Sequence, residues 1–285
     1  MMIELAFTKM QGLGNDFVVV DDLFESATQG HPLRSWDAQR ICDRRFGVGA
    51  DQILWLKQAL SHSCDARMEI LNADGSTAEM CGNGIRAVAL YLKDRSLEKK
   101  DEYTIETLAG LMRVHVQGDE VRVDMGVPQF SRAGFCAEKI QAADRTFEFY
   151  DVNMGNPHAV IFVEDVDVIP LEGYGPILEK HPRFPQRTNV EFVQVLSPHS
   201  IRVRVWERGA GVTLACGTGA CASAVATLAS QRGEGELDVL LPGGRLKVSW
   251  LGSKHSVFMT GPAARVYRGV YDWSIESRSS AGNQS

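Results

Sequence analysis

The sequence predicts an α+β fold of two similar lobes, produced by an internal duplication and related by a pseudo-twofold axis. The first observation is a Cys-Gly-x-Gly motif that occurs twice, at Cys81 and at Cys216. The second is that flanking strand patterns repeat at nearly the same spacing, about 135 residues, which is how a duplicated fold shows itself in a sequence. The third is that an apolar helical pattern follows each motif.

The repeated strand patterns lie on both sides of the two motifs. Gly110–Val116 and Gly244–Trp250 both alternate apolar and polar residues, as half-buried strands do. Upstream, one apolar strand pattern ends at Asn72 and its counterpart ends near Glu207. Several pairs in the same order at one spacing indicate a duplication and not chance similarity.

The chain begins with a strand pattern in Met1–Lys9, and a helix is expected after each motif. In the first helix Ile85, Val88, Ala89 and Leu92 fall on one face. The glycines of the motif permit a tight turn from strand to helix. We therefore expect both cysteines at helix N-termini, where free N–H groups and the positive end of the helix dipole lie.

The domain boundaries follow from the duplication. We expect an N-terminal lobe over residues 1–127, a C-terminal lobe over residues 128–275, and the linker between them within Pro128–Asp151. Residues 276–285 are rich in Ser, Gly and Asn, and this composition predicts a disordered tail.

Composition and charge exclude several classes of partner. The 285 residues are 44% hydrophobic, enough for a sizeable core, and the net charge of −6 comes without any run of Lys or Arg. A nucleic-acid or membrane surface is therefore not expected, and a small molecule is the expected ligand. The N-terminus has no signal-peptide pattern, which favours a cytoplasmic protein.

Six cysteines are present, but no C-x-x-C spacing suggests a zinc site, so no metal is expected. Cysteines are commonly buried as small apolar residues. This interpretation suffices for Cys42, Cys64, Cys136 and Cys221, whereas the two motif cysteines call for a further explanation.

Two symmetry-related cysteines suit the inversion of a stereocentre. A pseudo-twofold axis would place Cys81 and Cys216 face to face across the lobe interface. Inversion requires a base on one face of a carbon and an acid on the other, and a thiolate and a thiol supply both. Because a helix N-terminus lowers a thiol pKa toward neutrality, we expect the two cysteines to hold one proton between them.

The same helix N-termini offer a substitute for a cofactor. The N–H groups of Gly82, Asn83, Gly217 and Thr218 are expected to bind the α-carboxylate of an amino acid. Negative charge enters that carboxylate as the α-proton leaves, and preorganised donors stabilise it. The sequence shows no assignable phosphate cradle or Schiff-base lysine, so no cofactor is expected.

Other interpretations remain open at this point. A single Cys-Gly-x-Gly turn is often only a packing feature, and a thiol–disulfide enzyme would also use two cysteines. A cysteine hydrolase with His158 as the base would leave the second cysteine idle. Gly12-x-Gly14 lacks the third glycine and the following helix of a dinucleotide-binding motif.

Several blocks of sequence together resemble one known family. These blocks are Lys9-Met-Gln-Gly-Leu-Gly-Asn-Asp-Phe17, Gly49-Ala-Asp-Gln52, Asn72-Ala-Asp-Gly-Ser76, Met80-Cys-Gly-Asn-Gly84, Gly155-Asn-Pro-His158, Thr188-Asn-Val190, Glu207-Arg-Gly-Ala-Gly211 and Ala215-Cys-Gly-Thr-Gly219. The chain resembles the diaminopimelate epimerases from about Phe7 to Tyr271. Gln11 and Val212 depart from residues common in the family, and neither falls on a matched site position.

The resemblance implies two lobes, each a β-sheet wrapped around a central helix, with a crossing between lobes near the end of the chain. It implies a cofactor-independent epimerase, acting in lysine and cell-wall precursor biosynthesis, that interconverts LL- and meso-diaminopimelate. Cys81 and Cys216 match the catalytic pair, His158 and Glu207 match residues that tune it, and Tyr267 matches a homodimer-interface tyrosine. The positions that match substrate-binding residues are Asn15, Gln52, Asn72, Gly82, Asn83, Asn156, Asn189, Glu207, Arg208, Gly217 and Thr218.

The chemistry of the polar positions agrees with that implication. Diaminopimelate carries an ammonium and a carboxylate at each end, and asparagines with one guanidinium can bind the end that does not react. Proline and hydroxyproline epimerases remain an alternative, although they usually have His at the position of Asn83. A non-catalytic amino-acid binder with the same lobes is another, and it would not need both thiols.

Overall fold

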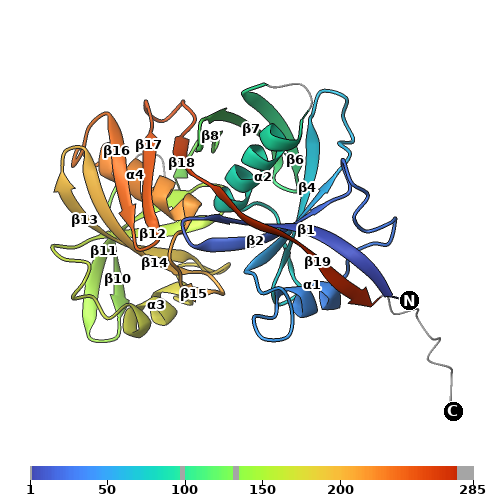
Figure 1. Ribbon diagram of the computed structural model, residues 1–285. Coiled ribbons are helices and arrows are strands. Elements are labelled where there is room, and N and C mark those ends of the chain that lie inside the picture. Colours follow the sequence, from blue (N-terminus) through green and yellow to red (C-terminus); the bar gives the residue numbers. More distant parts are fainter. Residues whose placement is uncertain (1, 97–99, 131–134, 275–285) are drawn as a thin grey trace, which may run out of the picture.

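The computed structural model describes residues 2–96, 100–130 and 135–274, and these form two lobes side by side (Figure 1). The fold class is α+β, as predicted. Each lobe has one long helix and one short helix. They are α1 (Ser35–Cys42) and α2 (Gly82–Arg95) in the first lobe, and α3 (Leu171–Glu179) and α4 (Gly217–Ala229) in the second.

The sheet of the first lobe contains the N-terminal strands and the last strand of the described chain. The strands are β1 (Met2–Gly12), β2 (Asn15–Asp21), β3 (Gln52–Lys57), β4 (Ala66–Asn72), β5 (Thr77–Ala78), β6 (Glu102–Thr107), β7 (Gly110–Gln117), β8 (Glu120–Asp124) and β19 (Ala264–Ser274). β19 runs antiparallel to β1, with Met2 opposite Ser274 and Gln11 opposite Ala264.

The sheet of the second lobe contains the remaining strands. They are β9 (Gln129–Phe130), β10 (Glu138–Ala142), β11 (Arg145–Asn153), β12 (Pro157–Phe162), β13 (Asn189–Ser197), β14 (Ser200–Glu207), β15 (Gly211–Val212), β16 (Glu236–Leu241), β17 (Gly244–Ser249) and β18 (Phe258–Pro262).

The strand pairings confirm the internal duplication. In the first lobe β2 and β3 are parallel, β3 and β4 antiparallel, and β4 and β6 parallel. The second lobe repeats this order with β12 and β13, β13 and β14, and β14 and β16. The repeated strand patterns of the sequence are β7 and β17, and the strands expected to end at Asn72 and Glu207 are β4 and β14.

The two sheets are joined at the pseudo-twofold axis. β8 and β18 are equivalent strands of the repeat, and they pair antiparallel, with Arg122 opposite Thr260. The main hydrophobic core continues through this junction and contains residues of α2 and α4 from both lobes. The junction therefore holds the two helices in one rigid frame.

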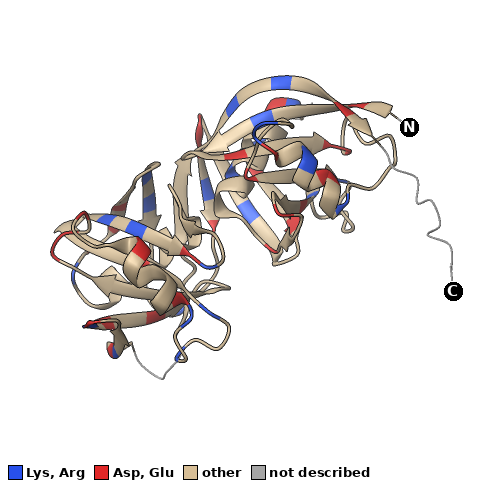
Figure 2. Ribbon diagram, turned by 90° about the horizontal axis from the view of Figure 1, so that it is seen from below, with Lys and Arg blue, Asp and Glu red and all other residues tan. Residues whose placement is uncertain are grey.

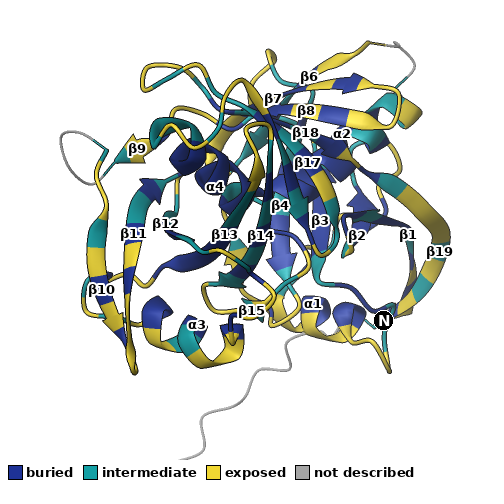
Figure 3. Ribbon diagram, turned by 90° about the vertical axis from the view of Figure 1, so that its left-hand side faces the viewer, coloured by how far each residue is buried: buried dark blue, intermediate teal, exposed yellow. Residues whose placement is uncertain are grey.

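Each central helix is buried by its own sheet. α2 contacts β1, β7 and β8, and α4 contacts β11, β12, β13 and β17. Both helices are almost entirely buried along their length, as Figure 3 shows. A helix that is apolar on most sides is stable only inside a core, and here a curved sheet supplies that core. Two smaller clusters pack α1 and α3 against the outer faces of the sheets.

Much of the segment Pro128–Asp151, within which the linker was expected, is strand. β9, β10 and the first part of β11 lie there, and β10 and β11 form a hairpin that packs on the α3 side of the second sheet. Ile140, Phe147 and Phe149 point inward from this hairpin and are buried. Their alternation with polar residues is a strand signal, and it was overlooked beside the stronger repeat. The predicted tail, residues 276–285, lies outside the described residues.

Acidic and basic side chains are interspersed over both lobes in Figure 2. None of the helices in the described part of the chain has the length and apolar character needed to cross a membrane.

Candidate active site

The two motif cysteines are the N-caps of the two central helices, as predicted. The Cys81 sulfur accepts a hydrogen bond from the Gly84 N–H at 3.3 Å, and the Cys216 sulfur accepts one from the Gly219 N–H at 3.3 Å. Each helix begins inside the motif, at Gly82 and Gly217, and not after it as the sequence pattern suggested. A sulfur that caps a helix lies directly beside its unpaired N–H groups.

The two helix N-termini meet head to head at the lobe junction. A Cβ placed on Gly82 would lie 3.4 Å from the Cα of Gly217, and one placed on Gly217 would lie 3.3 Å from the Cα of Gly82. Met259 on β18 covers both turns from one side. Close approach therefore requires a residue as small as glycine at both positions, unless Met259 or the opposite turn shifts by a few tenths of an ångström. The motif glycines thus bring the Cys81 turn and the Cys216 turn to one point.

Asparagines surround the first cysteine. The Cys81 thiol donates to Oδ1 of Asn15 at 3.6 Å, and the Asn83 amide donates to the same oxygen at 3.3 Å. The Asn83 amide also donates to the backbone carbonyl of Ala215 at 3.0 Å, in the residue before Cys216. Asn83 therefore links the surroundings of one cysteine to the turn that carries the other.

The second cysteine ends a chain of hydrogen bonds that begins at a buried hydrogen bond between His158 and Glu191. His158 and Glu191 are both fully buried and lie 2.7 Å apart. The other ring nitrogen of His158 is 2.9 Å from Oδ1 of Asn156, whose amide donates to the Thr218 hydroxyl at 3.3 Å. That hydroxyl is 3.5 Å from the Cys216 sulfur. His158 therefore reaches the sulfur through two intermediates and not directly.

Glu207 lies on the Cys216 side of the junction at the end of β14. Its carboxylate accepts a hydrogen bond from the Thr213 hydroxyl at 2.5 Å. Burial raises the pKa of Glu207, and the neighbouring Glu191 carboxylate raises it further. Glu207 also raises the pKa of both thiols, so the three groups influence one another electrostatically.

The expectation of a lowered thiol pKa is wrong for the substrate-free protein. Burial raises the pKa of Cys81 to about 11, and burial with the Glu207 and Glu191 carboxylates raises the pKa of Cys216 well above its ordinary value. The backbone N–H groups at the helix N-termini act in the opposite direction but do not outweigh the loss of water. Burial therefore favours the protonated form of both thiols in the substrate-free protein.

The residues expected at the far end of the substrate form two small polar groups. In the first lobe the Gln52 amide donates to Asn72 at 2.8 Å, and the Asn72 amide donates to Ser76 at 2.9 Å. Oδ1 of Asn72 therefore accepts a hydrogen bond within the protein, whereas Oε1 of Gln52 is buried without a partner among the described residues.

In the second lobe Asn189 is used to build the loop that carries Arg208. Its amide donates to the Pro157 carbonyl at 2.9 Å, and its oxygen accepts from the Arg208 N–H at 2.9 Å. The Arg208 side chain is exposed and donates to the Gln186 carbonyl at 3.2 Å. Asn189 therefore fixes the backbone of Arg208, and the Gln186 carbonyl holds its guanidinium, which remains accessible.

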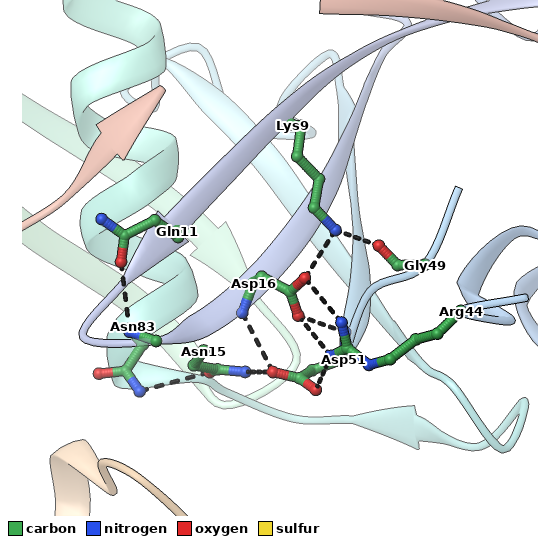
Figure 4. A network of polar contacts seen from close by, with 9 residues as sticks. Lys9, Gln11, Asn15, Asp16, Arg44, Gly49, Asp51 and Asn83 are labelled. Atoms are coloured by element: carbon green, nitrogen blue, oxygen red, sulfur yellow. Dashed lines mark hydrogen bonds and ion pairs between the residues drawn. The ribbon is translucent and has the colours of Figure 1, made fainter. Parts of the chain in front are cut away.

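A charge network of Lys9, Asp16, Arg44 and Asp51 lies next to Asn15 (Figure 4). Lys9 is buried and forms an ion pair with Asp16 at 2.7 Å, and it also donates to the Gly49 carbonyl. Arg44 bonds both Asp16 and Asp51, and the Asp51 carboxylate accepts from the Asn15 amide at 2.7 Å. The network fixes the Asn15 amide, so that its oxygen faces Cys81.

Asp16 makes the stability of this network dependent on pH. Burial alone would raise the pKa of Asp16, but hydrogen bonds from Arg44 and Lys9 lower it to about 2. Its unfolded pKa is about 3.9, so its ionisation contributes about 2 kcal/mol of stability, fully present above about pH 5 and lost as the pH falls toward 2.

We expect Asp16→Asn to destabilise the protein by about 2 kcal/mol or more at pH 7, because Lys9 then stays buried without its partner. The difference from wild type should shrink between pH 5 and pH 3. Urea unfolding at pH 7 and at pH 3 measures this difference in the free energy of unfolding, with the exposed Asp119→Asn as the control. A difference that is the same at pH 3 as at pH 7 would contradict this electrostatic role.

Some parts of the site could not be identified from the sequence alone. Glu191, Thr213, Arg86 and the Lys9 network were not singled out, although each lies within or close to a recognised block. Tyr267 is on β19, away from the cysteines, where its ring contacts the edge of Phe7 at 5.9 Å and is partly exposed. Within the described ranges, no group of three or more His, Cys, Asp or Glu side chains has the arrangement of a metal site.

Solved structures share this architecture. A probable proline racemase from Agrobacterium radiobacter superimposes with a TM-score of 0.71 at 15% identity, over 97% of this chain and 94% of that one. A hydroxyproline epimerase from Agrobacterium vitis gives 0.67 at 16% identity, over 94% and 91% of the two chains. The fold is therefore shared with the two-lobed racemases and epimerases.

Sequence relatives define the family within that class. The family model described as diaminopimelate epimerase matches residues 7–131 and 150–266. A diaminopimelate epimerase of Desulforudis audaxviator is 48% identical over 280 residues, covering 94% of this chain and 99% of the relative. One from Desulfitobacterium hafniense is 46% identical, over 93% and 98% of the two chains. The chain belongs to the diaminopimelate epimerase family, as its sequence motifs indicated.

Proposed function

We propose that the protein interconverts LL- and meso-diaminopimelate by a two-base mechanism, with Cys81 and Cys216 as the two acid/base residues. The observation that supports this most strongly is the head-to-head contact of Gly82 and Gly217, which directs two sulfur-capped helix N-termini at one point. A carbon held there has one sulfur on each face. One thiolate removes the α-proton, and the opposite thiol delivers a proton to the other face.

The helix N-termini bind the α-carboxylate in this proposal. The N–H groups of Gly82, Asn83, Gly217 and Thr218 belong to the first turns of α2 and α4, where no helical acceptor is available for them. As the α-proton leaves, its electron pair is delocalised into the carboxylate, which gains negative charge. Fixed N–H donors stabilise that charge without reorganisation, so the reaction proceeds without an added cofactor.

Substrate binding brings a positive charge that favours ionisation of a thiol. Both thiols are neutral in the substrate-free protein because burial raises their pKa values. The α-ammonium of the substrate brings a positive charge next to them, and a nearby cation favours the thiolate. His158 and Glu207 tune the pair: His158 through Asn156 and Thr218, and Glu207 through its own charge.

The far end of diaminopimelate is recognised by the two polar groups at the ends of β4 and β14. Gln52 and Asn72 come from the first lobe, and Asn189 and Arg208 come from the second. Asn15, Asn156 and Glu207 contact the substrate closer to the two cysteines. Gln52 has a buried acceptor with no partner among the described residues, which suits an ammonium donor. The Arg208 guanidinium suits the distal carboxylate.

The assembly and the setting of the enzyme are also proposals. β19 exposes Val266, Tyr267 and Val270, and we propose that this strand forms a homodimer contact. We propose the division into an N-terminal lobe, residues 1–127, and a C-terminal lobe, residues 128–275. β19 belongs to the second segment in sequence but pairs with β1, so the proposed dimer contact lies on the N-terminal lobe. A role in lysine and cell-wall precursor biosynthesis follows from the substrate, and the six free thiols suit the reducing cytoplasm.

The test is the inversion of LL-diaminopimelate by protein that has been dialysed against a chelator and freed of pyridoxal phosphate. Chiral chromatography should show meso-diaminopimelate forming until the two isomers reach equilibrium, and proline should remain unchanged. A requirement for added cofactor, or inversion of proline at a comparable rate, would contradict the proposal.

A further inference from the structure

Arg86 is a buried cation that the reaction described so far does not use. It lies on α2, five residues after Cys81, and its side chain is completely buried. Among the residues that the structure describes, no carboxylate forms an ion pair with it. A buried charge without a counter-ion is costly, and proteins retain such charges mainly at functional sites.

Only neutral acceptors hold the guanidinium in place. Arg86 donates to the Gly82 carbonyl at 2.9 Å, to Oδ1 of Asn83 at 2.9 Å and to the Pro262 carbonyl at 3.3 Å. Its remaining close contact is the sulfur of Met259 at 3.8 Å. Although burial lowers the pKa of Arg86 to about 10, the group is still charged at neutral pH. The full positive charge is therefore present and uncompensated.

Two of these contacts lead directly to the proposed carboxylate donors. The Gly82 carbonyl and the Asn83 N–H belong to the same peptide group. A cation bonded to that carbonyl polarises the peptide and makes its N–H a stronger donor, as in any cooperative chain of hydrogen bonds. Pro262 and Met259 belong to β18, and Met259 also touches Gly217. Arg86 therefore lies beneath the point where the two helix N-termini meet.

The second lobe has no equivalent cation. The residue at the corresponding place on α4 is Cys221, a buried thiol five residues after Cys216. The two central helices are otherwise alike, so packing alone does not demand an arginine at this position. One cation at the junction serves both turns, because the turns touch.

We propose that Arg86 is a positioning residue that strengthens the Cys81 turn and the Cys216 turn as an anion site. Its counter-ion is the carboxylate of the amino-acid substrate. The charge of that carboxylate rises from one toward two units as the α-proton leaves. A fixed cation stabilises the state of higher charge more than the ground state. Arg86 therefore contributes more to kcat than to KM. The inference rests on the proposed epimerase reaction.

The experiment compares Arg86→Gln, Arg86→Lys and Arg204→Gln with wild type. Arg204 also donates to two backbone carbonyls, those of Val166 and Ile169, but in the second lobe and away from the junction. We measure kcat and KM for the inversion of diaminopimelate, together with the urea midpoint of each variant. Arg86→Gln should lower kcat about 10²-fold and raise KM by less than about tenfold. Arg86→Lys should recover part of kcat, and Arg204→Gln should change stability alone.

The outcomes separate this inference from the function on which it rests. Inactive wild-type protein would contradict the epimerase proposal itself. Active wild type with Arg86→Gln of unchanged kcat would overturn the role of Arg86 only. If Arg86→Lys recovered none of the kcat that Arg86→Gln loses, the role of Arg86 would be one in folding. The same would hold if Arg204→Gln lowered kcat as much at equal stability. Either result would also overturn the proposed role of Arg86.

Discussion

Cys81→Ser and Cys216→Ser are each expected to lower kcat by about 10²–10⁴-fold, the usual contribution of a general acid–base group. A serine hydroxyl has nearly the size of the thiol and still caps its helix, so the turn should keep its shape. It is a far weaker acid, however, and burial would oppose its ionisation as it opposes that of the thiols. Neither variant can therefore provide a base on the altered face.

The matched control is Cys221→Ala, which changes another buried thiol on the same helix as Cys216. We expect it to retain activity within a few-fold. Steady-state rates in both directions, with unfolding curves for all three variants, make the comparison. If either serine variant kept nearly full activity while folded, the two-base mechanism would be excluded.

Discrimination against lysine is the second large effect. Lysine lacks the distal carboxylate, and a site built for polar partners rejects an analogue without them by about 10⁴–10⁵-fold, because its own groups are left unpaired. The accessible guanidinium of Arg208 and the Gln52–Asn72 pair provide those partners here. We therefore expect kcat/KM for lysine to be about 10⁴-fold or more below that for diaminopimelate.

Arg208→Lys tests which residue is responsible. An ammonium cannot reproduce the planar fork of a guanidinium, so kcat/KM for diaminopimelate should fall by at least about tenfold. Arg202→Lys is the control, since Arg202 lies on β14, the strand that leads to Arg208, but pairs with Asp167 on the surface. Lysine turned over within about tenfold of diaminopimelate by the wild type would contradict the assignment of these residues.

The two-lobe architecture could be predicted from the sequence because the duplicated motifs are still recognisable in it. Two Cys-Gly-x-Gly motifs at one spacing predicted two lobes and two capped helices, and close approach requires both glycines. The repeat does not predict the hairpin of β10 and β11, because its counterpart is the pair β1 and β19, which lie at opposite ends of the described chain. The two strands of that pair are therefore not neighbours in the sequence.

The electrostatics of the site could not be predicted from motifs, because the two lobes differ in their buried residues. Equivalent strands place Phe17 opposite Gln52 in one lobe and His158 opposite Asn189 in the other. The second lobe thus has a buried His–Glu pair where the first has apolar residues, and the first has a buried arginine where the second has Cys221. The pKa of each thiol depends on burial and on these differences, which only the assembled structure shows.

The source of the new α-hydrogen tests the central claim most directly. LL-diaminopimelate is incubated with the enzyme in deuterated buffer, and both isomers are isolated early in the reaction for mass spectrometry. With one sulfur on each face, the opposite thiol carries solvent deuterium, so the meso product should contain deuterium at the inverted carbon while the remaining LL isomer stays unlabelled. A meso product that retains the original hydrogen, or an LL isomer labelled as fast as the product, would show a single base and contradict the account.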